Sequence, residues 1–470
     1  MLGLFGTLNL GARSLQTQQQ GIEVAGQNLA NVNNAAYARQ RVALQTSVTI
    51  NGQIGPQGTG AEAVAIVQIR SGLLDDQIQA ETSVRGSLEA QQLALQYAEA
   101  NLGTQIDRVA SGSDTASVSG AHNLAGGLSD LFNSFQSVSA NPTSMTERES
   151  LLMNAVTLTT QFQQVDQRLG NLTASLNESV ETDVGSANQL LADIAKLNDQ
   201  IGIAEASSNG VANDLRDLRQ QKIEALAKVV KIDVATGAQG SADISIAGTT
   251  MVSGNEVAET LQTYDAGGGQ ILVRAASTAT PLTLTGGSLQ GTIDARDGAV
   301  ASLRTSINSL AAQLISEVNV IHAAGFSLTG STGENFFTGT NAADMQVNST
   351  LLNDPSLFQA AGVAGGTGEN QVALALAQLA GKKLPALNGQ TLSQGYSQTV
   401  AALGQSLASV NTQLSDQEVV EKMLTQQRSS VSGVSLDEEM TDLTKFQRAY
   451  QASAKLISIV DEMLDTVVNM

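Results

Sequence analysis

The sequence predicts a mainly α-helical protein with an inserted β-rich domain, built as a nested multidomain rod whose N- and C-terminal helices pair as a coiled-coil domain. Three observations favour this fold class. Apolar residues recur every seven positions near both chain ends, and long three-four patterns run through the segments between them. A stretch rich in Gly, Thr, Ser and Val, at about 230–292, interrupts the helical signal.

The apolar stripes at the two ends predict helices that each carry one apolar edge. Ser435 and Glu438 have the spacing of a capping box at the start of the C-terminal helix. Because an isolated helix is stabilised mainly by burying its apolar face, we assign the stripes as the candidate assembly interface. The stripe residues are Leu8, Leu15, Ile22 and Leu29 at the N-terminus, and Leu436, Leu443, Tyr450, Ile457 and Leu464 at the C-terminus.

Longer helices are predicted between the ends. A third heptad stripe consists of Leu88, Leu95, Leu102 and Val109. Ser144 and Glu147 form a second capping box, before three-four patterns at 155–176 and 190–201. Further helical patterns cover 300–321, which Asp297 is expected to cap, and 403–414.

The segment 231–292 is predicted to contain short strands between Gly-rich turns, and 325–370 to be mostly loop. Since helical patterns flank the strands on both sides, the chain is expected to run out along a rod and return. The expected domains are a terminal helical assembly domain (1–60 with 430–470), a long-helix rod (61–230 with 293–429) and an outer β domain (231–292).

The composition excludes several classes of protein. With 24 basic and 44 acidic residues the net charge is −20, which disfavours nucleic acid and anionic membranes as partners. The absence of Cys excludes disulfides and thiol chemistry. No apolar run approaches the roughly 18 residues of a membrane span, and the first basic residue, Arg13, follows the N-terminal apolar stretch instead of preceding it. We therefore expect a protein that stays in the cytoplasm or is exported with its N-terminus uncleaved.

No catalytic, cofactor-binding or metal-binding residues are predicted. His122 and His322 lack a second ligand at metal spacing. Asp214 and Asp217 lie three apart among arginines, which is typical of a solvated, salt-bridged helix face. The Gly-rich segment 267–269 is not followed by Lys and Ser or Thr, and the segment 381–383 (GKK) lacks the upstream Gly and the following Ser or Thr of a phosphate loop.

Both ends of the chain resemble the flagellar axial family of rod, hook, junction and filament proteins. The segments 28–31 (NLAN) and 37–40 (YARQ) are similar to the family's N-terminal signature, with Asn28, Asn31 and Tyr37 as its motif residues and Ala36 where glycine is usual. The segment 438–454 is similar to the family's C-terminal helix. Internal segments resemble the hook–filament junction members in particular: 213–219 (NDLRDLR), 286–291 (GGSLQG) and 318–325 (VNVIHAAG).

This resemblance implies a non-enzymatic structural subunit that joins hook to filament in a short ring of its own copies. It implies the hook protein and a second junction protein as neighbours, and a flagellar export chaperone on the C-terminal helix. It also implies an extracellular location in the flagellum, reached unfolded through the flagellar type III export apparatus without a cleaved signal peptide.

Three other functions compete with this one. The chain could be another axial subunit (hook, distal rod or second junction protein). A secreted surface hydrolase on an axial-protein frame would need a catalytic cluster within 230–292 or 325–395, where we identify none. A cytoplasmic helical signalling module would fit the Gln- and Ala-rich helices but not the inserted strands.

Overall fold

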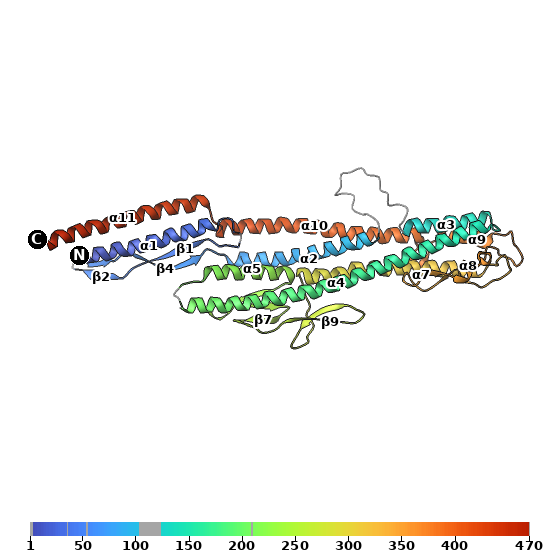
Figure 1. Cartoon of the computed structure of the whole chain (residues 1–470), viewed down its shortest axis with the longest axis horizontal. Coiled ribbons are helices and arrows are strands. Elements are labelled where there is room, and N and C mark those ends of the chain that lie inside the picture. Colours follow the sequence, from blue (N-terminus) through green and yellow to red (C-terminus); the bar gives the residue numbers. More distant parts are fainter. Residues whose placement is uncertain (1–2, 35, 53–54, 103–123, 208–209, 470) are drawn as a thin grey trace.

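The computed structural model describes residues 3–34, 36–52, 55–102, 124–207 and 210–469. The molecule is long and thin, and its first and last helices lie side by side at one end (Figure 1). Long helices form most of it, with a strand-rich insertion along one side. The predicted fold class is therefore confirmed, including the pairing of the terminal helices.

The helices are α1 (Leu4–Ala30), α2 (Gly72–Leu102), α3 (Leu124–Ala140), α4 (Met145–Ser207), α5 (Asn213–Val229), α6 (Gly287–Asp294), α7 (Ala301–Ala323), α8 (Ser349–Asn353), α9 (Gln371–Gln378), α10 (Leu392–Ser432) and α11 (Leu436–Val468). A π-helical segment covers Ala295–Val300, and short 3₁₀ turns lie at Ala238–Gly240, Pro355–Leu357, Leu379–Gly381 and Pro385–Leu387. No helix in this described part of the chain combines the length and the apolar character that crossing a bilayer requires.

The strands are β1 (Gln40–Thr46), β2 (Thr49–Gly52), β3 (Gly55–Gly58), β4 (Ala61–Gln68), β5 (Asp233–Thr236), β6 (Ala242–Ile246), β7 (Thr249–Ser253), β8 (Glu256–Val257), β9 (Leu261–Asp265), β10 (Ile271–Ala275), β11 (Phe337–Thr338) and β12 (Gln346–Val347). All pairings are antiparallel. The strands β5–β8 form a four-stranded sheet in sequence order, and the remaining strands form two-stranded pairs.

The long helices form the rod, whose apolar core runs from Leu88 to Leu414. The two predicted patterns at 155–176 and 190–201 belong to one helix, α4, whose 63 residues extend for about 95 Å. Side chains of its three-four stripe, such as Leu158, Phe162 and Leu169, are fully buried. Val109, from the third predicted stripe, lies outside the described residues.

Two glycines of α6 allow this helix to approach α2 and α5 at backbone distance. A Cβ atom on Gly291 would lie 2.1 Å from the carbonyl oxygen of Ser87 in α2. A Cβ atom on Gly287 would lie 2.3 Å from the carbonyl oxygen of Val229, and Gly287 also has a φ of +82°. Any other residue at these positions would push the helices apart.

The inserted strands lie against α4 and α5 and form a second apolar core with them. Strand β6 alternates between buried and half-buried residues, with Ile244 and Ile246 fully buried, as a period-two strand requires. The strands cover 233–275, within the segment that the sequence predicts to be β-rich.

A two-stranded ribbon over residues 40–68 was not predicted. Strand β1 pairs with β4, and β2 pairs with β3 at the tip. The domain boundary predicted at residue 60 divides this ribbon. The alternation of Val42, Leu44, Val48 and Ile50 was a sufficient signal for it, but the strong helical patterns on both sides concealed it.

The prediction that Asp297 caps a helix near Val300 is wrong. Helix α6, the π-helical segment and α7 run on without a break, so no helix begins there. The Asp297 carboxylate instead binds the guanidinium of Arg296, whose side chain is fully buried (Nε–Oδ1 2.7 Å).

At the far end of the rod, two buried basic side chains fix the predicted loop region. His322 accepts a hydrogen bond at Nε2 from the backbone of Gln359 and is bonded at Nδ1 to the carbonyl of Glu334. Arg148 donates to the carbonyls of Pro142 and Phe358. Burial lowers the pKa of His322 to about 4 and that of Arg148 to about 10.

The lowered pKa of His322 makes this end of the rod sensitive to acid. Protonation of His322 favours the unfolded chain, because the buried imidazole is neutral in the folded one. The free energy of unfolding is therefore fully retained above pH 6.5 and falls, by up to about 3 kcal/mol, as the pH decreases toward 4. Urea unfolding at pH 7, 6 and 5 should show this loss in the native chain and a smaller one in His322→Gln. Equal pH dependence in both chains would contradict the assignment. Asp217, whose raised pKa changes the stability with pH in the opposite direction, is present in both chains, so its contribution cancels in the comparison.

Candidate assembly interface of the terminal helices

Helices α1 and α11 pack antiparallel along most of their length. Ser14 and Ser453 are hydrogen-bonded through their hydroxyls (2.8 Å), and Asn28 donates to Glu439 (3.0 Å). A Cβ atom on Gly21 would lie 2.7 Å from the ring of Phe446, and one on Gly11 would lie 2.7 Å from Ile457. The line of contact on α1 therefore consists of small and polar residues, into which large side chains of α11 fit.

Among the predicted stripe residues, Ile457 lies on this line of contact, against Gly11, and none of the stripe residues is fully buried. On α1, Leu8, Leu15, Ile22 and Leu29 are half-buried, whereas Gly11, Thr17, Gly21, Val24, Ala25 and Asn28 are buried. On α11, Leu443, Ile457 and Leu464 are half-buried, and Leu436 and Tyr450 are exposed. A search for large aliphatic residues at heptad spacing could not find a contact line made mainly of small and polar residues.

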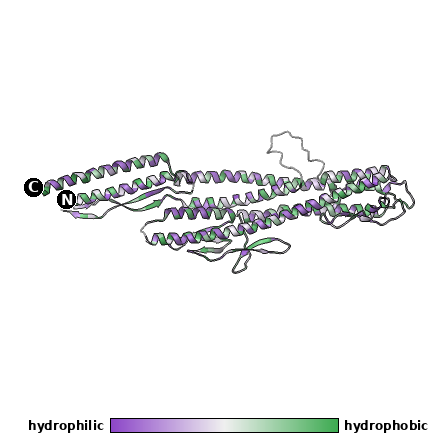
Figure 2. Cartoon of the chain, in the orientation of Figure 1, coloured by the Kyte–Doolittle hydropathy of each residue, from purple (hydrophilic) through white to green (hydrophobic). Residues whose placement is uncertain are grey.

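Much of the apolar surface of α11 is left uncovered. This helix buries only Glu439 and Val460 among its described residues. Apolar residues are spread along both terminal helices in Figure 2. The exposed apolar residues of α11 are Leu436, Met440, Tyr450, Leu456, Ile459, Met463, Val467 and Val468. Exposed apolar surface of this extent is typical of a protein–protein interface.

A groove between α1, α11 and the ribbon continues this surface. It has a volume of about 400 Å³, and Leu10, Leu44, Ala452 and Leu456 are among the residues that line it. Gly60, at φ +106°, lets the ribbon turn directly over Leu10. The ribbon thus forms part of the same apolar face as the two helices.

The motif residue Asn28 is the centre of a buried polar cluster where α1 ends. Its side chain is 1% exposed, and it makes all four hydrogen bonds that an amide can make. Its oxygen accepts from the Tyr37 hydroxyl and the Gln40 backbone, and its nitrogen donates to the Gln40 carbonyl and to Glu439. Asn31 lies outside this cluster and donates to the carbonyl of Gln27.

Arg39 connects the same cluster to the start of α11. Its guanidinium binds Glu439 (2.7 Å) and Glu438 (2.6 Å), and its backbone N–H donates to the carbonyl of Ser432. The predicted capping box of Ser435 and Glu438 is therefore wrong, because Ser435 makes no capping bond and Glu438 binds Arg39 instead. The box of Ser144 and Glu147 forms in part, with Ser144 accepting from the backbone of Glu147.

The first turn of α5 meets the base of the ribbon. Asp217 accepts hydrogen bonds from the Ala38 backbone and Arg70, and Asp214 accepts from Gln40. Asp217 is 6% exposed, and burial raises its pKa to about 6. The expectation of a solvated face is confirmed for Asp214, which is exposed, and is wrong for Asp217, which the ribbon covers.

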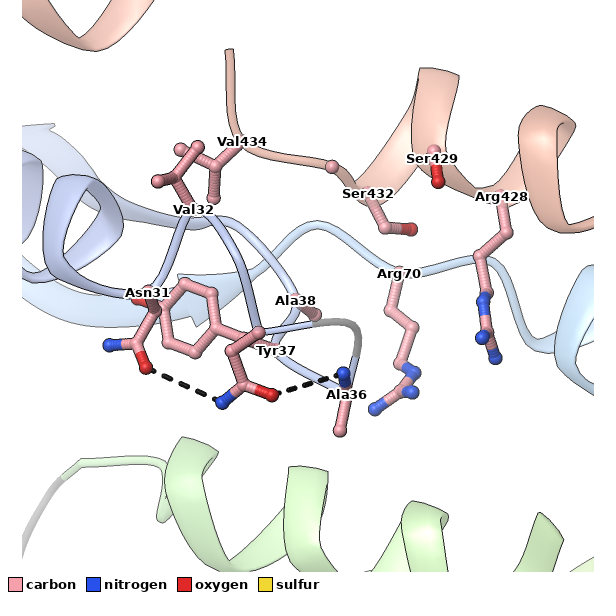
Figure 3. Close-up of a pocket in the computed structure, with 12 residues that line it drawn as sticks. Asn31, Val32, Ala36, Tyr37, Ala38, Arg70, Arg428, Ser429, Ser432 and Val434 are labelled. Atoms are coloured by element: carbon pink, nitrogen blue, oxygen red, sulfur yellow. Dashed lines mark hydrogen bonds between the residues drawn. The ribbon is translucent and has the colours of Figure 1, made fainter. Parts of the chain in front are cut away.

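A pocket of about 260 Å³ lies beside this joint. Arg70 and Arg428 line it together with Tyr37 and Ser432 (Figure 3). Arg70 also binds Asp75, and Arg428 binds Glu224. Since both arginines are already paired with carboxylates, the pocket is part of the joint and has no evident ligand.

The described residues contain no group of three or more His, Asp or Glu side chains that could hold a metal ion. Both ring nitrogens of His322 are hydrogen-bonded to backbone groups at the far end of the rod, and His122 lies outside the described residues.

Comparisons with known proteins match both the rod and the terminal helix. The family model described as the flagellar hook-associated protein FlgK helical domain matches residues 104–337, and that described as flagellar basal body rod FlgEFG protein C-terminal matches residues 425–470. Flagellar hook-associated protein 1 of Bacillus subtilis is 26% identical to this chain over 100% of the chain and 99% of the relative.

The chain belongs to the flagellar hook-associated protein 1 family.

Other members of this family match along nearly the same length. The hook-associated protein 1 of Escherichia coli is 22% identical over 98% of this chain and 99% of its own. A solved structure described as the flagellar hook junction protein FlgK from Burkholderia pseudomallei shares the fold, with a TM-score of 0.62 and 17% identity over 76% of this chain and 100% of that chain. As a member of this family, the chain is a structural subunit of the bacterial flagellum that forms the junction between hook and filament.

Proposed function

We propose that the terminal unit of this subunit, namely α1, the ribbon (40–68) and α11, makes the contacts that build the junction. The observation that carries this proposal is the uncovered apolar face of α11, which the groove beside Leu10 and Leu44 continues. In the proposed assembly, copies of this chain form a short ring. The hook protein lies on one side of the ring, and a second junction protein lies on the other.

Within this proposal, the predicted stripe residues present their uncovered surface to neighbouring subunits. Leu8, Leu15, Ile22 and Leu29 are half-buried, so each leaves surface for a further contact. The exposed residues Leu436 and Tyr450 extend that surface along α11. The rod (61–230 with 293–429) lies farther out, and the β domain (231–292) lies on its side.

We also propose that the chain reaches the flagellum by the flagellar type III export route, unfolded and without a cleaved signal peptide. A cytoplasmic export chaperone would cover α11 before export, because this helix leaves most of its apolar residues exposed. The chain carries no enzymatic activity in this proposal, in keeping with a structural family.

The test is deletion of the gene, followed by electron microscopy of the cells and assay of flagellin in the medium. The expected result is cells with hooks but no filaments, and unpolymerised flagellin outside. The native gene supplied in trans should restore filaments. Normal filaments and motility in the deletion strain would contradict the proposal, and a hydrolase activity in the purified protein would contradict the absence of catalysis.

A further inference from the structure

The terminal unit is joined to the rod without a shared apolar core. The two apolar clusters of the described residues begin at Leu88 and Val180, and neither includes a residue from 3–70 or 436–469. The chain itself crosses the joint twice, at 69–71 and at 433–435, between the elements on either side. Apolar packing therefore does not fix the direction of the terminal unit, as it would in a single domain.

Hydrogen bonds and ion pairs instead fill the joint, and most of them meet at the first turn of α5. Asn213 donates to the carbonyl of Ile66 (2.9 Å), and its own carbonyl accepts from Gln68 (2.8 Å). Asp214 accepts from Gln40 (3.2 Å). These contacts link α5 to both strands at the base of the ribbon.

Asp217, one turn further along α5, completes the set. It accepts from the backbone of Ala38 (3.2 Å) and pairs with Arg70 (2.9 Å). Arg70 lies in the connection between the ribbon and α2, and it also pairs with Asp75 near the start of α2 (2.8 Å). Residues 213–217 thus bind the ribbon at residues 40, 66 and 68 and the chain on either side of it at residues 38 and 70. This segment, 213–217, lies within the internal segment 213–219 (NDLRDLR) described above.

We propose that residues 213–217, here called the α5 latch, hold the terminal unit in one direction relative to the rod, and that 69–71 and 433–435 act as a hinge when the latch is removed. Polar contacts suit this role, because hydrogen bonds and ion pairs form only over a narrow range of distances and angles, whereas apolar packing is not directional. Breaking it leaves charged groups unpaired without disturbing either apolar core. Asn213, Asp214 and Asp217 are therefore positioning residues for the assembly surface.

The test uses the full-length purified chain, which has no native Cys. Gln45→Cys in β1 and Ser186→Cys in α4 place spin labels on exposed positions of the ribbon and the rod. Pulsed electron–electron distance measurements should give one narrow distribution with the native latch. In N213A/D217A the distribution should broaden by at least about twofold, as hinge motion becomes available.

The matched control is Q189A/D193A, which removes an amide and a carboxylate that lie within the rod, including the Asp193–Lys222 pair between α4 and α5. Its distribution should stay narrow. Q68A/R70Q removes the partners of Asn213 and Asp217 and leaves the sequence of α5 unchanged. It should therefore broaden the distribution even if N213A/D217A disturbs the helix.

A broad distribution in the native chain, or a narrow one in both Q68A/R70Q and N213A/D217A, would overturn the latch. The measurement does not depend on flagellar assembly. Failure of the latch is therefore distinguishable from failure of the proposed junction contacts.

Discussion

Replacing Gly21 by leucine is expected to abolish filament assembly. A Cβ atom at this position would lie 2.7 Å from the ring of Phe446 in α11. The Phe446 Cγ atom would itself lie 2.8 Å from the added Cβ, so rotation of the ring about its own axis cannot relieve the clash. A leucine is therefore expected to force α1 and α11 apart. Overpacking of a close contact costs about 1–3 kcal/mol, and the displaced helix also misplaces the apolar surface of α11.

The matched control is Gly26→Leu on the same helix, since a Cβ atom on Gly26 would meet nothing within 4 Å. Both variants should be supplied to the deletion strain, with immunoblots to confirm equal amounts of protein. Filaments counted by electron microscopy should be near zero for G21L and near the native number for G26L. If the two variants assemble equally, close pairing of α1 with α11 is not required for assembly.

Replacing Gly291 by alanine should cause a large loss of stability of the rod. The added Cβ would lie 2.1 Å from the Ser87 carbonyl oxygen. The Cα atom that carries it and the Ser87 carbonyl both belong to helical backbone, so neither can rotate away. Helices α2 and α6 must therefore separate along their contact. We expect a loss of about 3 kcal/mol in the free energy of unfolding, at the upper end for overpacked sites.

Gly185→Ala is the control, because a Cβ atom on this exposed residue of α4 would meet nothing within 4 Å. Alanine favours a helix interior over glycine by about 1 kcal/mol, so this variant should be slightly more stable than the native chain. Urea unfolding followed by circular dichroism measures both changes. A Gly291→Ala chain as stable as the native one would show that α2 and α6 can separate freely.

The long elements could be predicted from the sequence because their apolar residues repeat at helical spacing over many turns. The stripe of α4, from Leu151 to Ile201, is buried with few interruptions, so the pattern and the core coincide. The inserted strands were recognisable because Gly-rich turns separate short alternating runs. The pairing of the chain ends followed from the out-and-back order of these elements.

The contacts within the candidate site could not be predicted in the same way. The line where α1 meets α11 depends on glycines, which carry no side chain and no hydrophobic signal. The joint depends on Asp217 and Glu439, which resemble ordinary surface charges in the sequence and are buried only because Ala38, Arg39 and Arg70 reach them from distant segments. Polar contacts between residues 179 or 400 positions apart leave no local pattern.

The pairing of the first helix with the last also bears on the order in which the subunit folds. Ser14 and Ser453 are 439 positions apart, whereas α3 and α4 are neighbours in the chain. Bringing distant segments together carries a larger entropic cost than closing a short loop, and distant contacts form more slowly. We therefore expect the rod to fold first and the terminal pair to close last, so that the surface for polymerisation exists only once the chain is complete.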